Sequence, residues 1–248
     1  MKVYFHENFY RIYTHDPAAA AGRMEAIVQA IEDHVTLCAF PPAAEADLRR
    51  AHSQGHIDAI REQGLYDIAA LAAGGAIAAA ETGMDDPCFA LIRPPGHHAS
   101  ASSCWGFCFF NNLAISLHRL RASGRIKTAF VLDFDLHFGD GNVNILGSEA
   151  WVEILNPESA SRAAYLKQVQ RALDATFADV IAVSAGFDNH LEDWGGLLAT
   201  EDYRTMGGWV REAARRNRGG CYGILEGGYN HAVLGSNVLA FLEGLGGL

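Results

Sequence analysis

The sequence contains few cysteines, and their arrangement is not typical of a disulfide framework or a thiolate zinc site. There are five, an odd number, and no two form a CxxC motif. Small disulfide scaffolds and cysteine zinc sites both need clustered cysteines at short spacing. By their spacing Cys104 and Cys108 could join a metal site, although packing roles are favoured. The others are scattered at Cys38, Cys88 and Cys221.

The sequence also lacks long apolar runs and a surplus of basic residues. Its apolar runs are too short to span a bilayer, and residues 1–20 lack the layout of a signal peptide. We therefore expect a soluble, cytoplasmic protein that binds no membrane. Lys and Arg number 19 against 29 Asp and Glu, a formal net charge of −10, which argues against nucleic-acid binding. Such a charge either attracts cationic substrates or serves solubility.

What the 248 residues contain is a regular alternation of short apolar segments with longer segments of helical periodicity. This pattern predicts βα units, and hence a mostly parallel sheet with helices on both faces, in one α/β domain spanning residues 1–248. The predicted strands are 2–7, 88–93, 128–137, 151–156, 179–188 and 221–228. The predicted helices are 24–34, 56–63, 66–81, 111–123, 162–177, 200–216 with Thr200 as its cap, and a last one ending near 245.

Four of the predicted strands end in polar or glycine-rich sequences. Parallel sheets bind ligands outside the carboxyl ends of their strands, so these segments are expected to meet at one edge. The segments are RPPGHHASASSCWGF after strand 88–93, DFDLHFGDG at the end of 128–137, SAGFDNH at the end of 179–188, and LEGGYN at the end of 221–228.

The DFDLH segment is a candidate metal site. Residues two apart in a strand point to one side, so Asp135 and His137 share a face with Asp133. Neighbouring carboxylates resist burial unless a cation lies between them, and Asp and His are both zinc ligands. Asp188 is the natural third ligand, at the end of the following strand. Taken alone, the same acids could instead cap a helix or meet a basic side chain.

The adjacent histidines His97 and His98 follow two prolines and a glycine, so they lie on a stiff turn. Their side chains diverge, which favours proton transfer over binding one shared metal ion. Asp133 and Asp140 are the available carboxylate partners, although both histidines could merely satisfy loop carbonyls. Tyr229, after two glycines, could donate a hydrogen bond to an oxyanion or could simply pack.

Taken together, these segments resemble the signatures of the histone deacetylase and acetylpolyamine amidohydrolase superfamily. The matching segments appear in order as RPPGHHA, GFCFFNNLAI, VLDFDLHFGDGN, SAGFDNH with GGLLATEDY, and LEGGYN. The resemblance runs from about residue 90 to the C-terminus, and GRMEAI and AHSQGHIDAI extend it weakly toward the N-terminus. It implies an arginase-like three-layer α/β sandwich.

The resemblance implies a role for each matching residue. Asp135, His137 and Asp188 match the family's zinc ligands, with one zinc ion per chain. The residues that match catalytic positions are His97, His98, Asp133, Asp140 and Tyr229. Phe107 matches an aromatic wall of the substrate channel, and Gly106 and Gly228 are the expected substrate-binding glycines beside it. A structural potassium ion, held by backbone around Asp133, Asp135 and His137, is also implied.

The sequence departs from the family pattern in four places, one of them the early loops around residues 13–23 and 63–66, which look short. Phe138 stands where the family often has a second histidine. The link from Gly147 to Asp179 is short, which predicts a shallow pocket with Phe107 unpaired unless another subunit completes it. Trp194 replaces a residue that is often proline, and we expect a core anchor there rather than a rim residue. We expect a structural role for His190.

We therefore expect a zinc-dependent hydrolase that removes an acetyl or similar acyl group from an amine. The acidic charge favours a small acetylated amine or polyamine over acetyl-lysine of a histone. The expected partners are this substrate and, if loops are completed by a second chain, another copy of the protein. Two alternatives stay open: a metal-binding homologue with little turnover, and a ureohydrolase-like enzyme with two manganese ions. The latter would want further Asp and His ligands.

Overall fold

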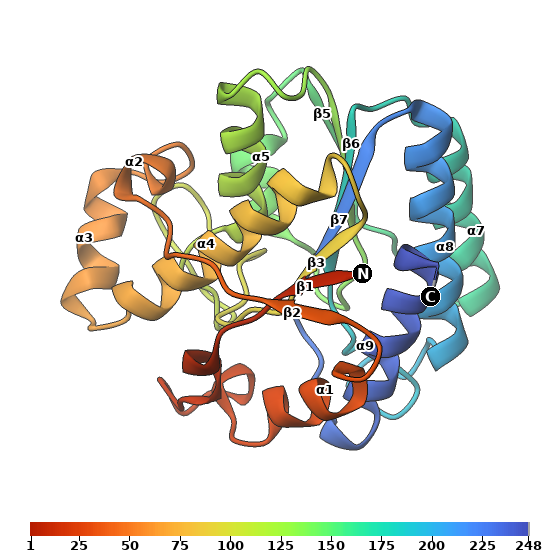
Figure 1. Cartoon of the computed structure of the whole chain (residues 1–248), viewed down its shortest axis with the longest axis horizontal. Coiled ribbons are helices and arrows are strands. Elements are labelled where there is room, and N and C mark those ends of the chain that lie inside the picture. The colour runs from red at the N-terminus through yellow and green to blue at the C-terminus, as the bar shows by residue number, and fades with distance from the viewer. Residues whose placement is uncertain (248) are drawn as a thin grey trace.

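The computed structural model describes residues 1–247, within which seven strands form one parallel sheet (Figure 1). Every neighbouring pair of strands runs parallel, in the order β2-β1-β3-β7-β6-β4-β5. The strands are β1 (Lys2–Tyr4), β2 (Thr36–Cys38), β3 (Cys88–Ala90), β4 (Ala129–Asp133), β5 (Val152–Leu155), β6 (Val180–Ala185) and β7 (Gly220–Leu225).

Helices cover both faces of the sheet, as the alternating pattern predicts. On one side α2 and α3 pack with α4 and α5, and on the other α1 and α8 pack against α9, with α7 beside α8 (Figure 1). None of the described helices is long and apolar enough to cross a membrane. The helices are α1 (Arg23–Ile31), α2 (Glu45–Leu48), α3 (Gln54–Glu62), α4 (Tyr66–Gly83), α5 (Asn112–Ala122), α6 (Asp140–Leu146), α7 (Arg162–Ala175), α8 (Thr200–Asn217) and α9 (His231–Gly246), with short 3-10 turns at η1 (Glu7–Tyr10) and η2 (Pro17–Ala19).

The central strands are buried on both faces, which explains why their sequences are continuously apolar rather than alternating. Every residue of β3, β4, β6 and β7 is buried. The edge strand β2 was not predicted, because it has only three residues and two of them are exposed. The parallel α/β sandwich expected from the sequence is otherwise confirmed.

The start of α8 differs from the prediction. Thr200 is the first residue of the helix rather than its cap, and the preceding Ala199 has no side chain that can accept a hydrogen bond. Instead, Asp202 Oδ2 accepts a hydrogen bond of 2.8 Å from the Ala199 backbone N–H. Arg162 holds the same carboxylate at 2.6 and 2.8 Å, so the helix start is tied to α7.

The four strands with polar ends are neighbours at the centre of the sheet, in the order β3-β7-β6-β4. Side chains alternate in direction along a strand, so Asp133 and Asp135 at the end of β4 point toward the site and Phe134 points into the core. There Phe134 contacts Phe187 and Phe241 edge-on, at centroid distances of 5.8 and 5.3 Å. This aromatic cluster supports both strand ends that carry the carboxylates.

Candidate active site

Three ligand groups converge at the carboxyl ends of β4 and β6. The ligand atoms of Asp135, His137 and Asp188 all lie within 4.8 Å of one another. His137 Nδ1 is 3.2 Å from Asp135 Oδ1 and 3.0 Å from Asp188 Oδ2. The structure therefore brings together the three residues that the sequence suggested as metal ligands.

The donor set fits a divalent cation. One oxygen of each carboxylate is fixed by backbone, with Gly227 N–H donating to Asp135 Oδ2 at 2.9 Å and Leu136 N–H to Asp188 Oδ1 at 3.0 Å. The other oxygen of Asp188 is buried, and the polar group facing it is the His137 ring nitrogen at 3.0 Å. Buried carboxylate oxygens are usually held by several partners, so this sparsely held one fits a metal ligand.

The electrostatics of the three groups agree with a positive charge at this point. Hydrogen bonding to Asp135 and then to Asp188 raises the pKa of His137 to about 10, so the carboxylates favour a cation beside them. Burial, reinforced by the nearby charge of Asp135, raises the pKa of Asp188 to about 6. A bound metal ion would relieve both the repulsion and the desolvation.

Each of the tandem histidines lies against one carboxylate. His97 Nδ1 is 3.2 Å from Asp133 Oδ2, and His98 Nδ1 is 2.6 Å from Asp140 Oδ1. The two imidazole centroids are 4.0 Å apart. His97 Nε2 faces the metal ligands, at 3.8 Å from Asp135 Oδ1. The pairs suggested from the sequence are therefore in contact.

The two imidazoles differ in their tendency to hold a proton. Burial lowers the pKa of His97, but the charges of Asp135 and Asp133 outweigh it and raise that pKa well above its ordinary value. Burial and the neighbouring His97 lower the pKa of His98 to about 4. At neutral pH His98 is therefore uncharged, with its Nδ1–H directed at Asp140 and Nε2 left as the proton acceptor.

Tyr229 follows β7, after a turn that requires glycine. Gly228 has φ +116°, and a Cβ there would meet Leu234 Cδ1 at 2.6 Å. Burial, with the charges of Asp135 and Asp188, raises the pKa of the Tyr229 phenol far above its ordinary value. The phenol therefore stays protonated and can donate a hydrogen bond.

Trp194 is not the core anchor that we expected. Its side chain is 54% exposed and stacks on the Tyr229 ring, with centroids 4.1 Å apart and planes at 24°. It also meets the His137 ring edge-on at 6.0 Å. Phe107 contacts Tyr229 edge-on at 6.0 Å, so Tyr229 has two aromatic neighbours.

The loop after β6 holds Trp194 in place. Asp193 Oδ2 accepts hydrogen bonds from the backbone N–H groups of Tyr229 and Asn230, at 2.7 and 2.8 Å. His190 is buried, and its Nδ1 accepts a hydrogen bond from Glu192 N–H at 3.1 Å. The structural role predicted for His190 is confirmed, because its ring fixes this loop.

A pocket of about 270 Å³ opens beside the metal ligands. The side chain of His137 is 38% exposed, whereas those of Asp135 and Asp188 are buried, so the group reaches solvent through the imidazole. Phe138, which had no predicted role beyond departing from the family pattern, is 58% exposed and lines this pocket. The exposed carboxylate of Glu158 adds negative charge. The lining residues are Asp135, Leu136, His137, Phe138, Asn156, Pro157 and Glu158.

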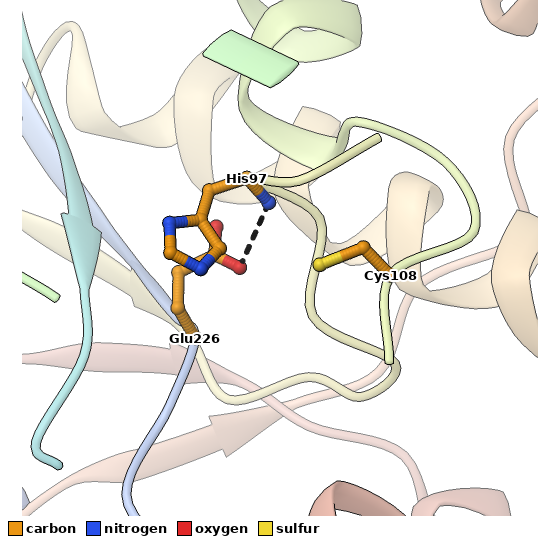
Figure 2. Close-up of side chains that lie close together, drawn as sticks. All are labelled: His97, Cys108 and Glu226. Atoms are coloured by element: carbon orange, nitrogen blue, oxygen red, sulfur yellow. Dashed lines mark hydrogen bonds between the residues drawn. The ribbon is translucent and has the colours of Figure 1, made fainter. Parts of the chain in front are cut away.

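A second group of residues of metal-ligand types lies close together: His97, Cys108 and Glu226 (Figure 2). Glu226 Oε2 already accepts hydrogen bonds from the backbone N–H groups of Gly96, at 2.6 Å, and His97, at 3.2 Å. Ser184 donates to its other oxygen at 3.2 Å. Burial raises the pKa of the Cys108 thiol well above its ordinary value, so the thiolate is disfavoured. This group anchors the histidine turn and is a poorer metal site.

Glu226 and Arg23 are site residues that sequence reasoning missed. Arg23 is fully buried, and its guanidinium donates to Gly228 O at 2.8 Å and to Glu226 O at 2.6 Å. It therefore fixes the turn that carries Tyr229. The only signals were the GRMEAI and LEGGYN segments, which mark no specific contact.

Comparison with known proteins identifies the relatives of this chain. The histone deacetylase domain family matches residues 17–156 and 147–245. A probable deacetylase of Methanothermobacter thermautotrophicus is 29% identical over 303 aligned residues, covering 99% of this chain and 91% of the relative. A histone deacetylase-like amidohydrolase of Pseudomonas aeruginosa is 29% identical, covering 94% of this chain and 79% of the relative.

The fold is shared with a solved deacetylase domain. The crystal structure of the HDA15 HD domain has a TM-score of 0.82 at 22% identity, covering 99% of this chain and 90% of that chain. The alignment with the Methanothermobacter protein, at 303 residues, is longer than this chain of 248, so the relative carries insertions that are absent here. The two matched stretches of the family meet at residues 147–156, where the sequence suggested a shortened link.

Proposed function

Since the chain belongs to the histone deacetylase family and is a hydrolase of amide bonds, we propose that it is a zinc-dependent deacetylase of acetylated amines. The observation that carries the proposal is the convergence of Asp135, His137 and Asp188, with a buried Asp188 oxygen facing His137, beside two histidine–aspartate pairs. A metal-binding protein without turnover would not need those pairs.

The three converging ligands would hold one zinc ion per chain. When bound, zinc would polarise the amide carbonyl and lower the pKa of a bound water toward about 7. His137 faces both carboxylates, so its Nδ1 would be the nitrogen ligand. The proposal also includes a structural potassium ion held by backbone around Asp133 and Asp135.

The remaining residues move protons and stabilise charge. Uncharged His98, with Nδ1–H donated to Asp140, accepts a proton from the attacking water at Nε2 and returns it to the leaving amine. His97 assists from 4.0 Å away, oriented by Asp133. The protonated phenol of Tyr229 donates a hydrogen bond to the developing oxyanion.

We propose a small acetylated amine with a second positive charge as the substrate. The protein carries a net charge of −10, and Glu158 lines the pocket beside the metal ligands. A carboxylate in this place would attract a free ammonium group at the far end of the substrate. Phe107, with Gly106 and Gly228 near it, would contact the acyl-amine itself.

The proposal is tested by zinc content and turnover on the same samples. The wild-type protein should bind one zinc ion and hydrolyse a monoacetylated diamine, and His137→Ala should lose both properties. Tyr229→Phe should keep the zinc and lose most turnover, because only the oxyanion donor is removed. Two manganese ions per chain, or zinc binding with no turnover across a panel of acyl-amines, would contradict the proposal.

The substrate class is tested separately. Glu158→Gln should raise KM several-fold for a monoacetylated diamine and leave the KM for an uncharged N-alkyl acetamide unchanged. Equal effects on the two substrates would remove the case for a cationic substrate without affecting the case for a deacetylase.

A further inference from the structure

Trp105 lies on the exposed side of the His98–Asp140 pair and contacts both members. Its indole ring is tilted 31° to the His98 imidazole, with centroids 3.9 Å apart. Its Nε1–H donates to Asp140 Oδ2 at 2.8 Å. Trp105 itself is 55% exposed, whereas the side chain of His98 is only 4% exposed. The indole therefore stands between this imidazole and solvent.

The backbone of the same loop fixes the indole in this place. Gly106 has φ +59°, and a Cβ added there would lie 2.4 Å from His98 Cδ2. Phe107, the next residue, also has a positive φ of 68°. Only glycine fits at position 106, because the loop passes directly against the His98 imidazole. The preceding residue, Trp105, therefore lies on the face of that ring.

Asp140 needs an external partner to keep one orientation. Its Oδ1 faces His98 Nδ1 at 2.6 Å, while its side chain is 43% exposed. The corresponding acid of the other pair, Asp133, is buried, and Asn142 Nδ2 donates to its Oδ2 at 2.9 Å. Trp105 therefore donates a hydrogen bond to the exposed carboxylate of Asp140, as Asn142 does to the buried carboxylate of Asp133.

We propose that Trp105 is a positioning residue that holds Asp140 in the plane of His98 and covers the imidazole from solvent. This inference rests on the proposed function, because the geometry it maintains is that of the proton-transferring pair. Trp105 acts through Asp140, and no contact with the substrate is required.

The first test removes the indole N–H while keeping an aromatic ring. Trp105→Phe should lower kcat about tenfold with KM changed less than twofold, because the loss acts on proton transfer rather than binding. Trp151→Phe is the matched control: Trp151 Nε1–H also donates to a carboxylate, Glu149, at 2.7 Å, but at the amino end of β5. That control should leave kcat unchanged. An unchanged kcat in Trp105→Phe would overturn the inference.

The second test asks whether Trp105 acts through Asp140. In a double-mutant cycle with Asp140→Asn, the double variant should be no slower than Asp140→Asn alone. Independent, multiplicative losses would overturn the inference, since they would mean that Trp105 contributes by another route.

A cycle on thermal unfolding separates this inference from the proposed function. If the wild-type protein hydrolysed no acyl-amine, the proposed function would fail, but the unfolding temperatures of the same four proteins would still report on the contact. Non-additive shifts for Trp105→Phe and Asp140→Asn support the fixed indole–carboxylate pair. Additive shifts would overturn it.

Discussion

The protein contains two buried histidine pairs that differ in the groups facing them. His52 and His56, on and before α3, have ring centroids 4.9 Å apart, and His97 and His98 have centroids 4.0 Å apart. All four residues are at most 6% exposed. The first pair contacts the segment between β3 and α5, and the second pair lies within that segment, so the two share surroundings but not partners.

The first pair is satisfied by backbone. His52 Nδ1–H donates to Ser100 O at 3.0 Å, and its Nε2 accepts from Asn111 N–H at 2.8 Å. His56 Nε2–H donates to Phe109 O at 2.7 Å. Burial, then the neighbouring His56, lowers the pKa of His52 to about 3. One ring nitrogen of His52 donates to a carbonyl and the other accepts from an N–H group. The ring therefore cannot bind a second proton without losing a hydrogen bond.

The second pair is satisfied by carboxylates. Asp133 and Asp140 each hold only the Nδ1 side of a ring, which leaves Nε2 available, and His97 Nε2 lies 3.8 Å from Asp135 Oδ1. The comparison teaches that burial alone does not distinguish a structural histidine from a chemical one. The partner does: backbone fixes the proton, and a carboxylate allows it to move.

Among the substitutions that distinguish the two histidine pairs, His98→Ala should have the largest effect, which is a loss of kcat. Loss of a general acid–base group lowers kcat roughly 10²- to 10⁴-fold, whereas the unfolding temperature should change little because the partner Asp140 remains hydrated. Steady-state kinetics on the best acyl-amine, with thermal unfolding of the same sample, measure both. His34→Ala, at an exposed position, is the control. A kcat within tenfold of wild type would contradict a chemical role for the second pair.

The reverse substitution, His52→Ala, should act on stability. It leaves the part-buried Ser100 C=O and the buried Asn111 N–H without their His52 partner, at about 1–3 kcal/mol each. We therefore expect unfolding in urea to become easier by about 3 kcal/mol, with kcat of the folded fraction within tenfold of wild type. Retained stability together with a large loss of kcat would show that this pair is not merely structural.

The fold could be predicted from the sequence in those segments where the local pattern of apolar residues determines the structure. The apolar runs of β4, β6 and β7 were recognised because each strand is buried on both faces. Helix α6 was missed, since DGNVNIL is rich in glycine and asparagine, which form helices poorly. Tertiary contacts stabilise it, among them the hydrogen bond from Asn142 to Asp133.

The site was predictable where its residues end strands or share a motif. Asp135, His137 and Asp188 follow buried strands, so their meeting at one edge follows from topology. Trp105 was not predictable, because the segment between β3 and α5 has no regular structure. Its path is set by contacts distant in sequence, such as that of His52 with Asn111, 59 residues apart.

A smaller effect should appear in the pH dependence of stability. The unfolded His52 has a pKa near 6.5 and the folded one about 3, so below pH 6.5 the unfolded chain binds one more proton. Its contribution to stability is present above pH 6.5 and is lost as the pH falls toward 3, at about 1.4 kcal/mol per pH unit. Urea unfolding from pH 7 to 5 should show a shallower slope in His52→Gln. Identical slopes would mean that His52 does not titrate on unfolding.

The smallest effect concerns Phe110, whose ring packs on the backbone-satisfied pair and on Tyr66. Its ring is 5.4 Å from that of His52 and 5.9 Å from that of His56, and the side chain is 1% exposed. Phe110→Leu keeps the site apolar but removes the aromatic contacts, which are worth about 0.5–1.5 kcal/mol. We expect unfolding to become easier by about 1 kcal/mol and kcat to stay within twofold of wild type. If kcat fell with stability in proportion, the two pairs would be one coupled unit, because a change confined to the structural pair would then reach the chemical one.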